Sequence, residues 1–143
     1  MRIAVGCDHT GVALKVALQD TVLAEHSVLD VGTDSTESVD YPDIARAVVD
    51  ALRRGEAERG ILICGTGIGM AMAAGRRRGI RAAVCTDPYM ATMSRRHNDA
   101  NVLCLGARVL GSGLAEAIVQ EWLAAEFDGG RHARRVEKIE TLA

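Results

Sequence analysis

The chain has 143 residues, of which 48% are hydrophobic and 25% charged, with a formal net charge of -2. This balance is typical of one globular domain with an apolar core, and it gives no global field that would recruit nucleic acid or an anionic membrane. The four cysteines are far apart and form no C-x-x-C pair, so they indicate neither a zinc site nor a disulfide framework. Arg2 leads straight into a strand-like run and no apolar run approaches the length of a membrane span, so we expect a cytoplasmic protein.

Short apolar runs alternate with longer helical patterns along the whole chain. The apolar runs predict strands over residues 2–7, 27–32, 59–64, 80–85 and 101–106. Helical spacing predicts helices over residues 11–25, 41–54, 68–75, 87–98, 112–126 and about 131–142. The polar residues 33–40 predict a loop between the second strand and the second helix.

The alternation of strand and helix, with strands that are apolar on both faces, predicts a parallel sheet covered by helices. We therefore expect a single α/β domain, with a doubly wound, Rossmann-like sheet of five parallel strands in three layers. In this architecture, ligands bind outside the carboxyl ends of the strands. The residues found there are Cys7-Asp8-His9, Gly32-Thr33-Asp34, Cys64-Gly65-Thr66-Gly67, Thr86-Asp87-Pro88 and Gly106-Ala107-Arg108.

The stretch LICGTGIGMA, residues 62–71, joins the third strand to a helix through glycines at alternate positions. Glycines allow a tight bend that brings backbone N–H groups close to a ligand, and the helix N-terminus adds partial positive charge. This combination suits an anion, whether a phosphate, a carboxylate or the oxyanion of a reaction intermediate. It is neither G-x-G-x-x-G, because Met70 replaces the last glycine, nor a P-loop, which needs a lysine.

Four side chains are candidates for chemistry. Cys64 ends its apolar run directly before the glycine turn, where a thiolate is favoured, although a buried apolar cysteine explains the spacing equally well. His9 and His97 titrate near neutrality and suit acid–base work, and His97 also suits a helix C-terminus. Asp8 is suited either to holding a substrate hydroxyl or to capping the helix that follows.

Basic residues cluster at positions 76–78, 95–96 and 131–135. A solvated face is the better default for each cluster. Arg131 and Arg135 are four residues apart, so they share one helix face, where two guanidiniums can also grip a phosphate. The pattern alone does not decide between these two interpretations.

Six segments carry a resemblance to a known family over nearly the whole chain. They are GCDHTG (6–11), DYP (40–42), ILICGTGIGMAMAA (61–74), GIRAAVCTDPYMATMSRRHNDANVL (79–103), GARVLG (106–111) and GGRHARRVEKI (129–139). In this order they resemble type B ribose-5-phosphate isomerase. The resemblance implies reversible aldose–ketose isomerisation of a phosphosugar, without metal or organic cofactor. It also implies a homodimer or tetramer whose active sites are shared between subunits.

The resemblance assigns roles to matching residues. Cys64 matches the base that moves a proton between C2 and C1 through an enediolate, and Thr66 matches a hydroxyl that assists at the reacting end. His97 matches the residue that opens the furanose ring. Asp8 matches a residue that handles sugar oxygens, and Asn98 matches a contact to a sugar hydroxyl.

Binding residues are implied in the same way. The loop whose amides stabilise the enediolate is matched here by Gly65, Thr66, Gly67, Ile68, Gly69 and Met70. The loop that lines the site matches Asp40 and Tyr41. The phosphate grip matches His9, Arg108, Arg131 and Arg135, with His132 near the phosphate pocket. The two C-terminal arginines are expected from the neighbouring subunit, so the helix at about 131–142 reaches a partner.

The identity of the sugar stays open at this point. At two places just past the glycine loop, the chain differs from the usual pattern of the family that it resembles. Ala71 replaces a frequent serine, and Gly75-Arg76 replaces Asn-Lys. Relatives that use open-chain tetrulose phosphates tend to lack the ring-opening histidine, so His97 favours a cyclic substrate. Ribose 5-phosphate is the first expectation, and a six-carbon phosphosugar such as allose or galactose 6-phosphate, or free allose, is the alternative. A non-catalytic flavodoxin-like module that binds a phosphorylated ligand is the alternative from another class, although binding alone needs neither Cys64 nor His97.

Overall fold

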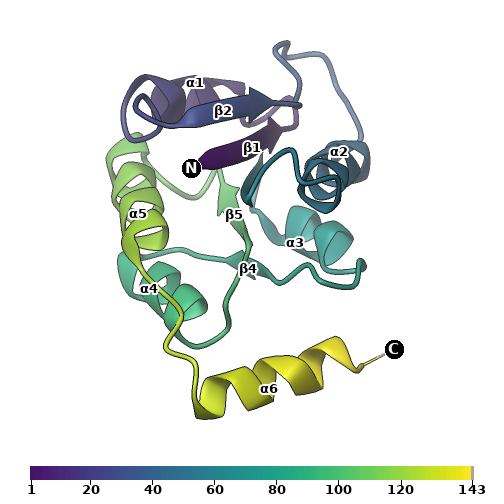
Figure 1. The fold of residues 1–143 in the computed structure, drawn as a ribbon. Helices are drawn as coiled ribbons and strands as arrows, with labels where there is room; N and C mark the ends of the chain where they lie inside the picture. The colour runs from purple at the N-terminus through teal and green to yellow at the C-terminus, as the bar shows by residue number, and fades with distance from the viewer. Residues whose placement is uncertain (143) are drawn as a thin grey trace.

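Five parallel strands form one sheet at the centre of the molecule (Figure 1). The computed structural model describes residues 1–142. The strands are β1 (Arg2–Cys7), β2 (Ser27–Asp30), β3 (Arg59–Cys64), β4 (Ala82–Val84) and β5 (Val102–Gly106), and they lie in the order β2-β1-β3-β5-β4. Every pairing is parallel, so the predicted fold class is confirmed.

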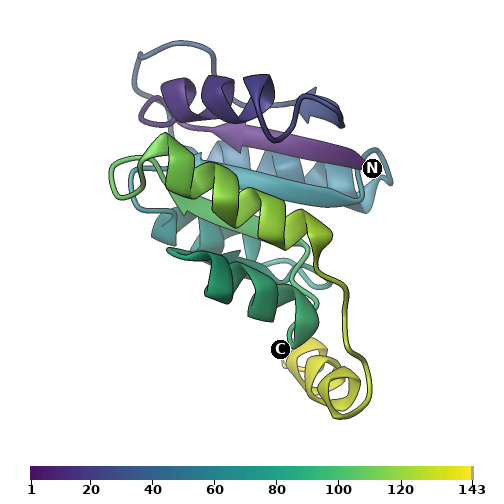
Figure 2. The same cartoon turned by 90° about the vertical axis from the view of Figure 1, so that its left-hand side faces the viewer.

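Helices cover both faces of the sheet (Figures 1 and 2). On one face lie α1 (Val12–Asp20), α4 (Pro88–Arg96) and α5 (Ser112–Ala124), and on the other lie α2 (Tyr41–Arg53) and α3 (Ile68–Ala74). The last helix, α6 (Arg131–Glu140), lies outside these three layers, beyond the β4 edge. Within residues 1–142, no helix combines the length and apolar composition needed to cross a membrane.

Alternate residues of the inner strands enter two separate cores. On β1, Ile3 and Val5 pack toward α1 and α5, whereas Ala4 packs toward α2 and α3. The strands β3 and β5 alternate in the same way. Burial of each large apolar side chain contributes roughly 1.5–3 kcal/mol, so the three inner strands hold the sheet in place between its helices.

The first helix is shorter than its sequence pattern predicts. It ends at Asp20 rather than near residue 25. The amide of Leu23 donates to the carbonyl of Leu18 at 2.9 Å, which closes a turn at the helix end. Leu23 is nevertheless 1% exposed, so the apolar spacing continues through a turn that periodicity cannot distinguish from helix. The other helix ends lie within two residues of their predicted positions.

The two outer strands also differ from the prediction. The strand expected over residues 80–85 is reduced to β4, because the amide of Ile80 bonds to the carbonyl of Arg77 in a turn. The other outer strand, β2, is largely exposed. The expectation of strands apolar on both faces is therefore wrong for β2 and holds for β1, β3, β4 and β5.

Two cationic side chains are buried in the body of the protein. Lys15 is 1% exposed and donates to Asp30 at 3.1 Å and to Asp34 at 2.8 Å. Burial opposes its charged form, but the hydrogen bonds to Asp34 and Asp30 outweigh this and raise the pKa of Lys15. Arg95 is 7% exposed, so the solvated face expected at residues 95–96 is wrong for Arg95.

Candidate active site

The winding of the sheet reverses between β1 and β3. The chain leaves β1 toward α1 on one face and leaves β3 toward α3 on the other. Asp8 and His9 follow β1, and Cys64 ends β3. The amide of Asp8 donates to the carbonyl of Ile63 at 3.0 Å, which joins the two strand ends. Ligands bind at this position in doubly wound sheets.

Cys64 differs from the other three cysteines in its surroundings. Burial raises the pKa of the Cys7 and Cys85 thiols to about 11 and also raises that of Cys104, so these three thiols are neutral near pH 7. The sulfur of Cys64 accepts a hydrogen bond from the amide of Gly67 at 3.2 Å. The thiol therefore lies against the glycine turn, where the sequence spacing predicts it.

Two glycines allow the turn after Cys64 to pack against the end of β5. Gly67 has a φ of +82°, and a Cβ there would lie 3.0 Å from the carbonyl carbon of Leu105. A Cβ on Gly106 would lie 2.8 Å from the carbonyl oxygen of Thr66. Real Cβ atoms rarely approach backbone so closely, so this turn depends on glycine at both positions.

The first turn of α3 offers backbone donors to a ligand. Thr66 Oγ1 accepts from the amide of Ile68 at 3.2 Å, and no side chain caps the helix N-terminus. The first amides of a helix have no intrahelical partner, so those of Gly69 and Met70 are able to donate to an anion. The structure thus places the predicted loop of residues 65–70 next to the Cys64 sulfur.

Asp8 and His9 are each held by one neighbour. Asp8 Oδ1 accepts from the amide and the hydroxyl of Thr10, at 2.9 and 2.6 Å. Asp8 therefore does not cap α1, whose N-cap is Gly11. The Nδ1 atom of His9 accepts from the amide of Val39 at 3.3 Å. A nitrogen that accepts carries no proton, so the ring hydrogen lies on Nε2, which is left as a donor.

Tyr41 and Arg108 complete this side of the site. A Cβ on Gly69 would lie 2.7 Å from the ring of Tyr41, so the tyrosine packs on the α3 turn. The Cδ of Arg108 lies 3.7 Å from the equivalent position on Gly65. We refer to the following group as the cysteine cluster: Asp8, His9, Tyr41, Cys64, residues 65–70 and Arg108.

The remaining predicted residues gather elsewhere, in what we refer to as the histidine cluster: His97, Asn98, Arg131, His132 and Arg135. The ring of His97, at the C-terminus of α4, stacks on that of His132 in α6, with centroids 4.2 Å apart and an angle of 6° between planes. Burial, with the positive field of His97, Arg131 and Arg135, lowers the pKa of His132 below 6.5. A phosphate suits this positively charged surface.

Within one chain the two clusters lie at opposite ends of the strands. The cysteine cluster lies where the strands end, at the carboxyl edge of the sheet, and the histidine cluster lies where they begin, at the amino edge. Arg81, directly before β4, donates to the carbonyl of Asn98 at 3.1 Å, which fixes the histidine cluster at the amino ends of the strands. Cys64 pairs with Gly106 at the carboxyl end of β5. At 3.3 Å per residue, β5 alone separates the two edges by roughly 13 Å. Residues expected at one site are therefore split, and His97 and Asn98 do not reach Cys64 of their own chain.

One group in residues 1–142 has the composition of a metal site. Ligand atoms of His97, Asp128 and His132 lie within 4.8 Å of one another. The two rings are parallel, so their lone pairs lie in parallel planes and do not converge on one point as tetrahedral ligation requires. Asp128 also accepts from Arg96 at 3.1 Å, and this bond holds the pKa of Asp128 below its usual value. The arrangement suits stacking and ion pairing better than metal binding.

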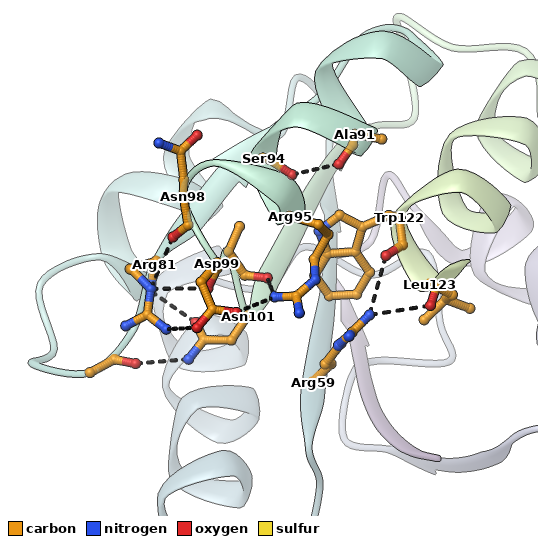
Figure 3. Close-up of polar contacts among 12 residues, drawn as sticks. Arg59, Arg81, Ala91, Ser94, Arg95, Asn98, Asp99, Asn101, Trp122 and Leu123 are labelled. Atoms are coloured by element: carbon orange, nitrogen blue, oxygen red, sulfur yellow. Dashed lines mark hydrogen bonds and ion pairs between the residues drawn. The ribbon is translucent and has the colours of Figure 1, made fainter. Parts of the chain in front are cut away.

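Sequence reasoning missed the residues that hold the histidine cluster in place. Asp99 has a φ of +47°, in the left-handed region, and its carboxylate binds Arg95 at 2.9 Å and Arg81 at 3.3 Å (Figure 3). The signal in the sequence was an aspartate three residues after the last residue of α4, because aspartate adopts the left-handed conformation more readily than most residues. Nothing comparable marks Arg81, because its partners lie in other segments.

The comparisons with known proteins show which proteins this chain resembles in sequence and fold. Residues 3–139 match the family described as Ribose/Galactose Isomerase. Ribose-5-phosphate isomerase B of Escherichia coli (strain K12) is 49% identical over 142 residues, which cover 99% of this chain and 95% of that protein. D-erythrulose-4-phosphate isomerase of Pectobacterium atrosepticum is 45% identical, covering 97% of this chain and 93% of that protein. The solved structure of Clostridium thermocellum ribose-5-phosphate isomerase B has a TM-score of 0.95 and 55% identity, covering 98% of this chain and 95% of that one.

Proposed function

The chain belongs to the ribose/galactose isomerase family, and on that premise we propose that it interconverts ribose 5-phosphate and ribulose 5-phosphate. The observation that carries the proposal is the position of Cys64. Its sulfur contacts the Gly67 amide at the switch point of the sheet, beside uncapped amides of α3. An isomerase of this kind needs one mobile base and a stabilised oxyanion, and this turn supplies a candidate for each.

The proposed reaction is proton transfer at neighbouring carbons. The Cys64 thiolate removes the proton from C2, and the bonding pair forms an enediolate whose oxygen is stabilised by the amides of residues 65–70. The hydroxyl proton passes from O2 to O1 and the same sulfur returns its proton to C1, so the carbonyl now lies at C2 and the product is the ketose. Thr66 assists at this end of the substrate, and Asp8 accepts hydrogen bonds from the sugar hydroxyls.

The histidine cluster supplies the other half of the proposed chemistry. His97 opens the furanose ring and Asn98 binds a sugar hydroxyl. Arg131 and Arg135 bind the phosphate together with His9 and Arg108, with His132 close by. The phosphate holds the sugar by its far end, and this binding energy positions the reacting carbons. His97 favours a cyclic aldose phosphate over the four-carbon substrate named for the Pectobacterium relative.

We propose that two subunits join the clusters in a homodimer. In one chain the clusters lie at opposite sheet edges, so a complete site needs the histidine cluster of a partner subunit. One chain leaves large apolar side chains exposed in the segments that follow the carboxyl ends of β3, β4 and β5: Ile68 51%, Met72 69%, Tyr89 72% and Val109 58%. An exposed apolar surface of this kind marks an interaction site. A two-fold dimer would then contain two equivalent shared sites.

A direct assay tests the proposed function. The purified protein is given ribose 5-phosphate, allose 6-phosphate and free allose, and ketose formation is followed. We expect the highest kcat/KM with ribose 5-phosphate. A higher kcat/KM with allose 6-phosphate or allose would show that the protein is an isomerase of that sugar instead. Binding of all three sugars without ketose formation would instead support the non-catalytic module.

A further inference from the structure

We propose that Arg81 is a positioning residue, whose guanidinium ties the turn after α4 to helix α6 and so holds His97 and His132 in register. The inference rests on the proposed function for its catalytic consequence, but its structural part is independent of it. Arg81 lies directly before β4, and its side chain is 18% exposed. The guanidinium is therefore mostly buried against other protein groups and is not part of a solvated face.

The first arm of this contact holds the turn that carries His97. The Nε atom of Arg81 donates to the carbonyls of Asn98 and Asp99, at 3.1 and 2.9 Å. A second nitrogen binds the Asp99 carboxylate at 3.3 Å. Figure 3 shows the Asn98 side chain directed away from the guanidinium, so Arg81 fixes the backbone and leaves that amide free.

The turn needs this support because its backbone is strained. Asp99 has a φ of +47°, a conformation that residues with a side chain rarely adopt. Arg95, buried behind the turn, binds the Asp99 carboxylate at 2.9 Å and the carbonyl of Ala100 at 2.7 Å. Two guanidiniums thus bind the backbone carbonyls of residues 98–100, which follow the end of α4.

The second arm holds α6. Arg81 donates to the carboxylate of Glu140, which also accepts from the amide of Gly79 at 3.0 Å. Apolar packing contributes little at this end of the helix, since Ile139 is 47% and Leu142 76% exposed and both line an open cavity. In α6, His132 is the buried residue. The position of the helix therefore depends on the Glu140 contact at one end and the His132 stack at the other.

Both sets of Arg81 contacts affect the same pair of rings, those of His97 and His132. The turn sets the position of His97, and α6 sets that of His132, so one guanidinium determines how the rings meet. Ring opening requires an imidazole held to within a fraction of an ångström of the sugar oxygen. Loss of Arg81 therefore costs rate through His97, although Arg81 touches no substrate.

The first test measures the rings themselves. Stacked imidazoles show upfield ring-current shifts in NMR spectra of the intact protein. We expect Arg81→Met to move the His97 and His132 ring resonances toward their unstacked positions. Glu140→Gln, which loosens only α6, should move them less, and it keeps the test open if Arg81→Met does not fold. The matched control is Arg77→Met, an exposed arginine of the preceding turn that lines the same cavity. Unchanged ring resonances in both folded test variants would overturn the proposal.

The second test is kinetic and separates positioning from general stability. Ribose 5-phosphate closes a furanose ring, whereas erythrose 4-phosphate cannot, because its O4 carries the phosphate. We expect Arg81→Met to lower kcat at least about tenfold with ribose 5-phosphate and much less with erythrose 4-phosphate. In a His97→Asn background the same substitution should add almost nothing.

The outcomes distinguish the two proposals. Equal losses on both substrates, or full additivity with His97→Asn, would show that Arg81 acts only through stability. If the wild-type protein converts neither sugar, the proposed function fails, while the NMR result still decides whether Arg81 holds the rings.

Discussion

The cysteine cluster and the histidine cluster are built by different means. The first lies at the carboxyl edge of the inner strands, and its geometry is set by backbone: a Cβ added at Gly67 or Gly106 would lie 3.0 Å or less from backbone atoms of other residues. The second lies on helix ends outside the sheet, and its geometry is set by long ionic side chains such as Arg81 and Glu140. The sheet fixes Cys64 by close packing, whereas His97 and His132 depend on ionic contacts that polar substitutions can loosen.

The comparison also explains why the proposed shared site needs two chains. A parallel sheet places all its strand ends of one kind at one edge. Residues at the end of a returning helix, such as His97, must then lie at the other edge. The two clusters meet only if a second chain presents its amino edge to the carboxyl edge of the first.

The largest expected effect comes from removing the base in the cysteine cluster. Cys64→Ala should lower kcat by about 10²–10⁴-fold or more, because no other group next to the glycine turn accepts the C2 proton. Phosphosugar binding should remain, since the binding residues are intact, and titration calorimetry would measure it. Cys85→Ala is the matched control, because Cys85 is a buried thiol outside both clusters. Activity near that of wild type in Cys64→Ala would show that the base is another residue.

The next largest effect tests whether each active site combines the cysteine cluster of one subunit with the histidine cluster of the other. Cys64→Ala and Arg135→Ala proteins should each be nearly inactive. After co-refolding, a mixed dimer contains one site with both defects and one with neither. Half of the dimers in a random mixture are mixed, so activity should recover to about a quarter of wild type.

Detection of the mixed dimers by differently tagged subunits is the control for this experiment. If they form and the mixture remains inactive, Arg135 acts in its own subunit and the two clusters are not shared. His97→Asn should complement Cys64→Ala in the same way when ribose 5-phosphate is the substrate, because the structure places His97 with Arg135.

A smaller effect tests how closely the cysteine cluster is packed. In Gly69→Ala the new methyl group would lie 2.7 Å from the Tyr41 ring, so the tyrosine must move. We expect kcat/KM to fall about tenfold, mostly through KM. Gly113→Ala is the control, because a Cβ there meets nothing within 4 Å. Unchanged kinetics in Gly69→Ala would mean that Tyr41 does not contribute to the site.

The smallest expected effect concerns the pH dependence of the histidine cluster. Burial and the positive charges of His97, Arg131 and Arg135 lower the pKa of His132 in the folded protein, with Asp128 opposing. The unfolded chain, with the ordinary value of 6.5, then binds more protons as the pH falls below 6.5, so stability decreases toward acid pH. His132→Gln should show a smaller decrease in Tm between pH 7.5 and 5.5 than wild type. An equal decrease would indicate that His132 titrates normally.

Several local features could be predicted from the sequence with little error. The start of α2 at Tyr41 follows from Pro42 in its first turn, and the inner strands follow from continuous apolar runs. The end of α1 could not be predicted in this way, because Leu23 keeps the helical spacing while its backbone turns. The buried state of Arg95 was also unpredictable, since its partner Asp99 adopts a backbone conformation that the sequence only suggests.

The sequence by itself determined the parallel sheet, the glycine turn beside Cys64 and the family, because these depend on local spacing and on motifs that are continuous in the chain. The tertiary structure decided which residues lie together. It placed Asp8, Tyr41 and Cys64 at the carboxyl ends of the inner strands, and it placed His97 at the amino ends, next to His132. The reason is geometric: a strand and its returning helix run in opposite directions, so the end of α4 lies at the amino ends of the strands, whereas Cys64 lies at the carboxyl ends.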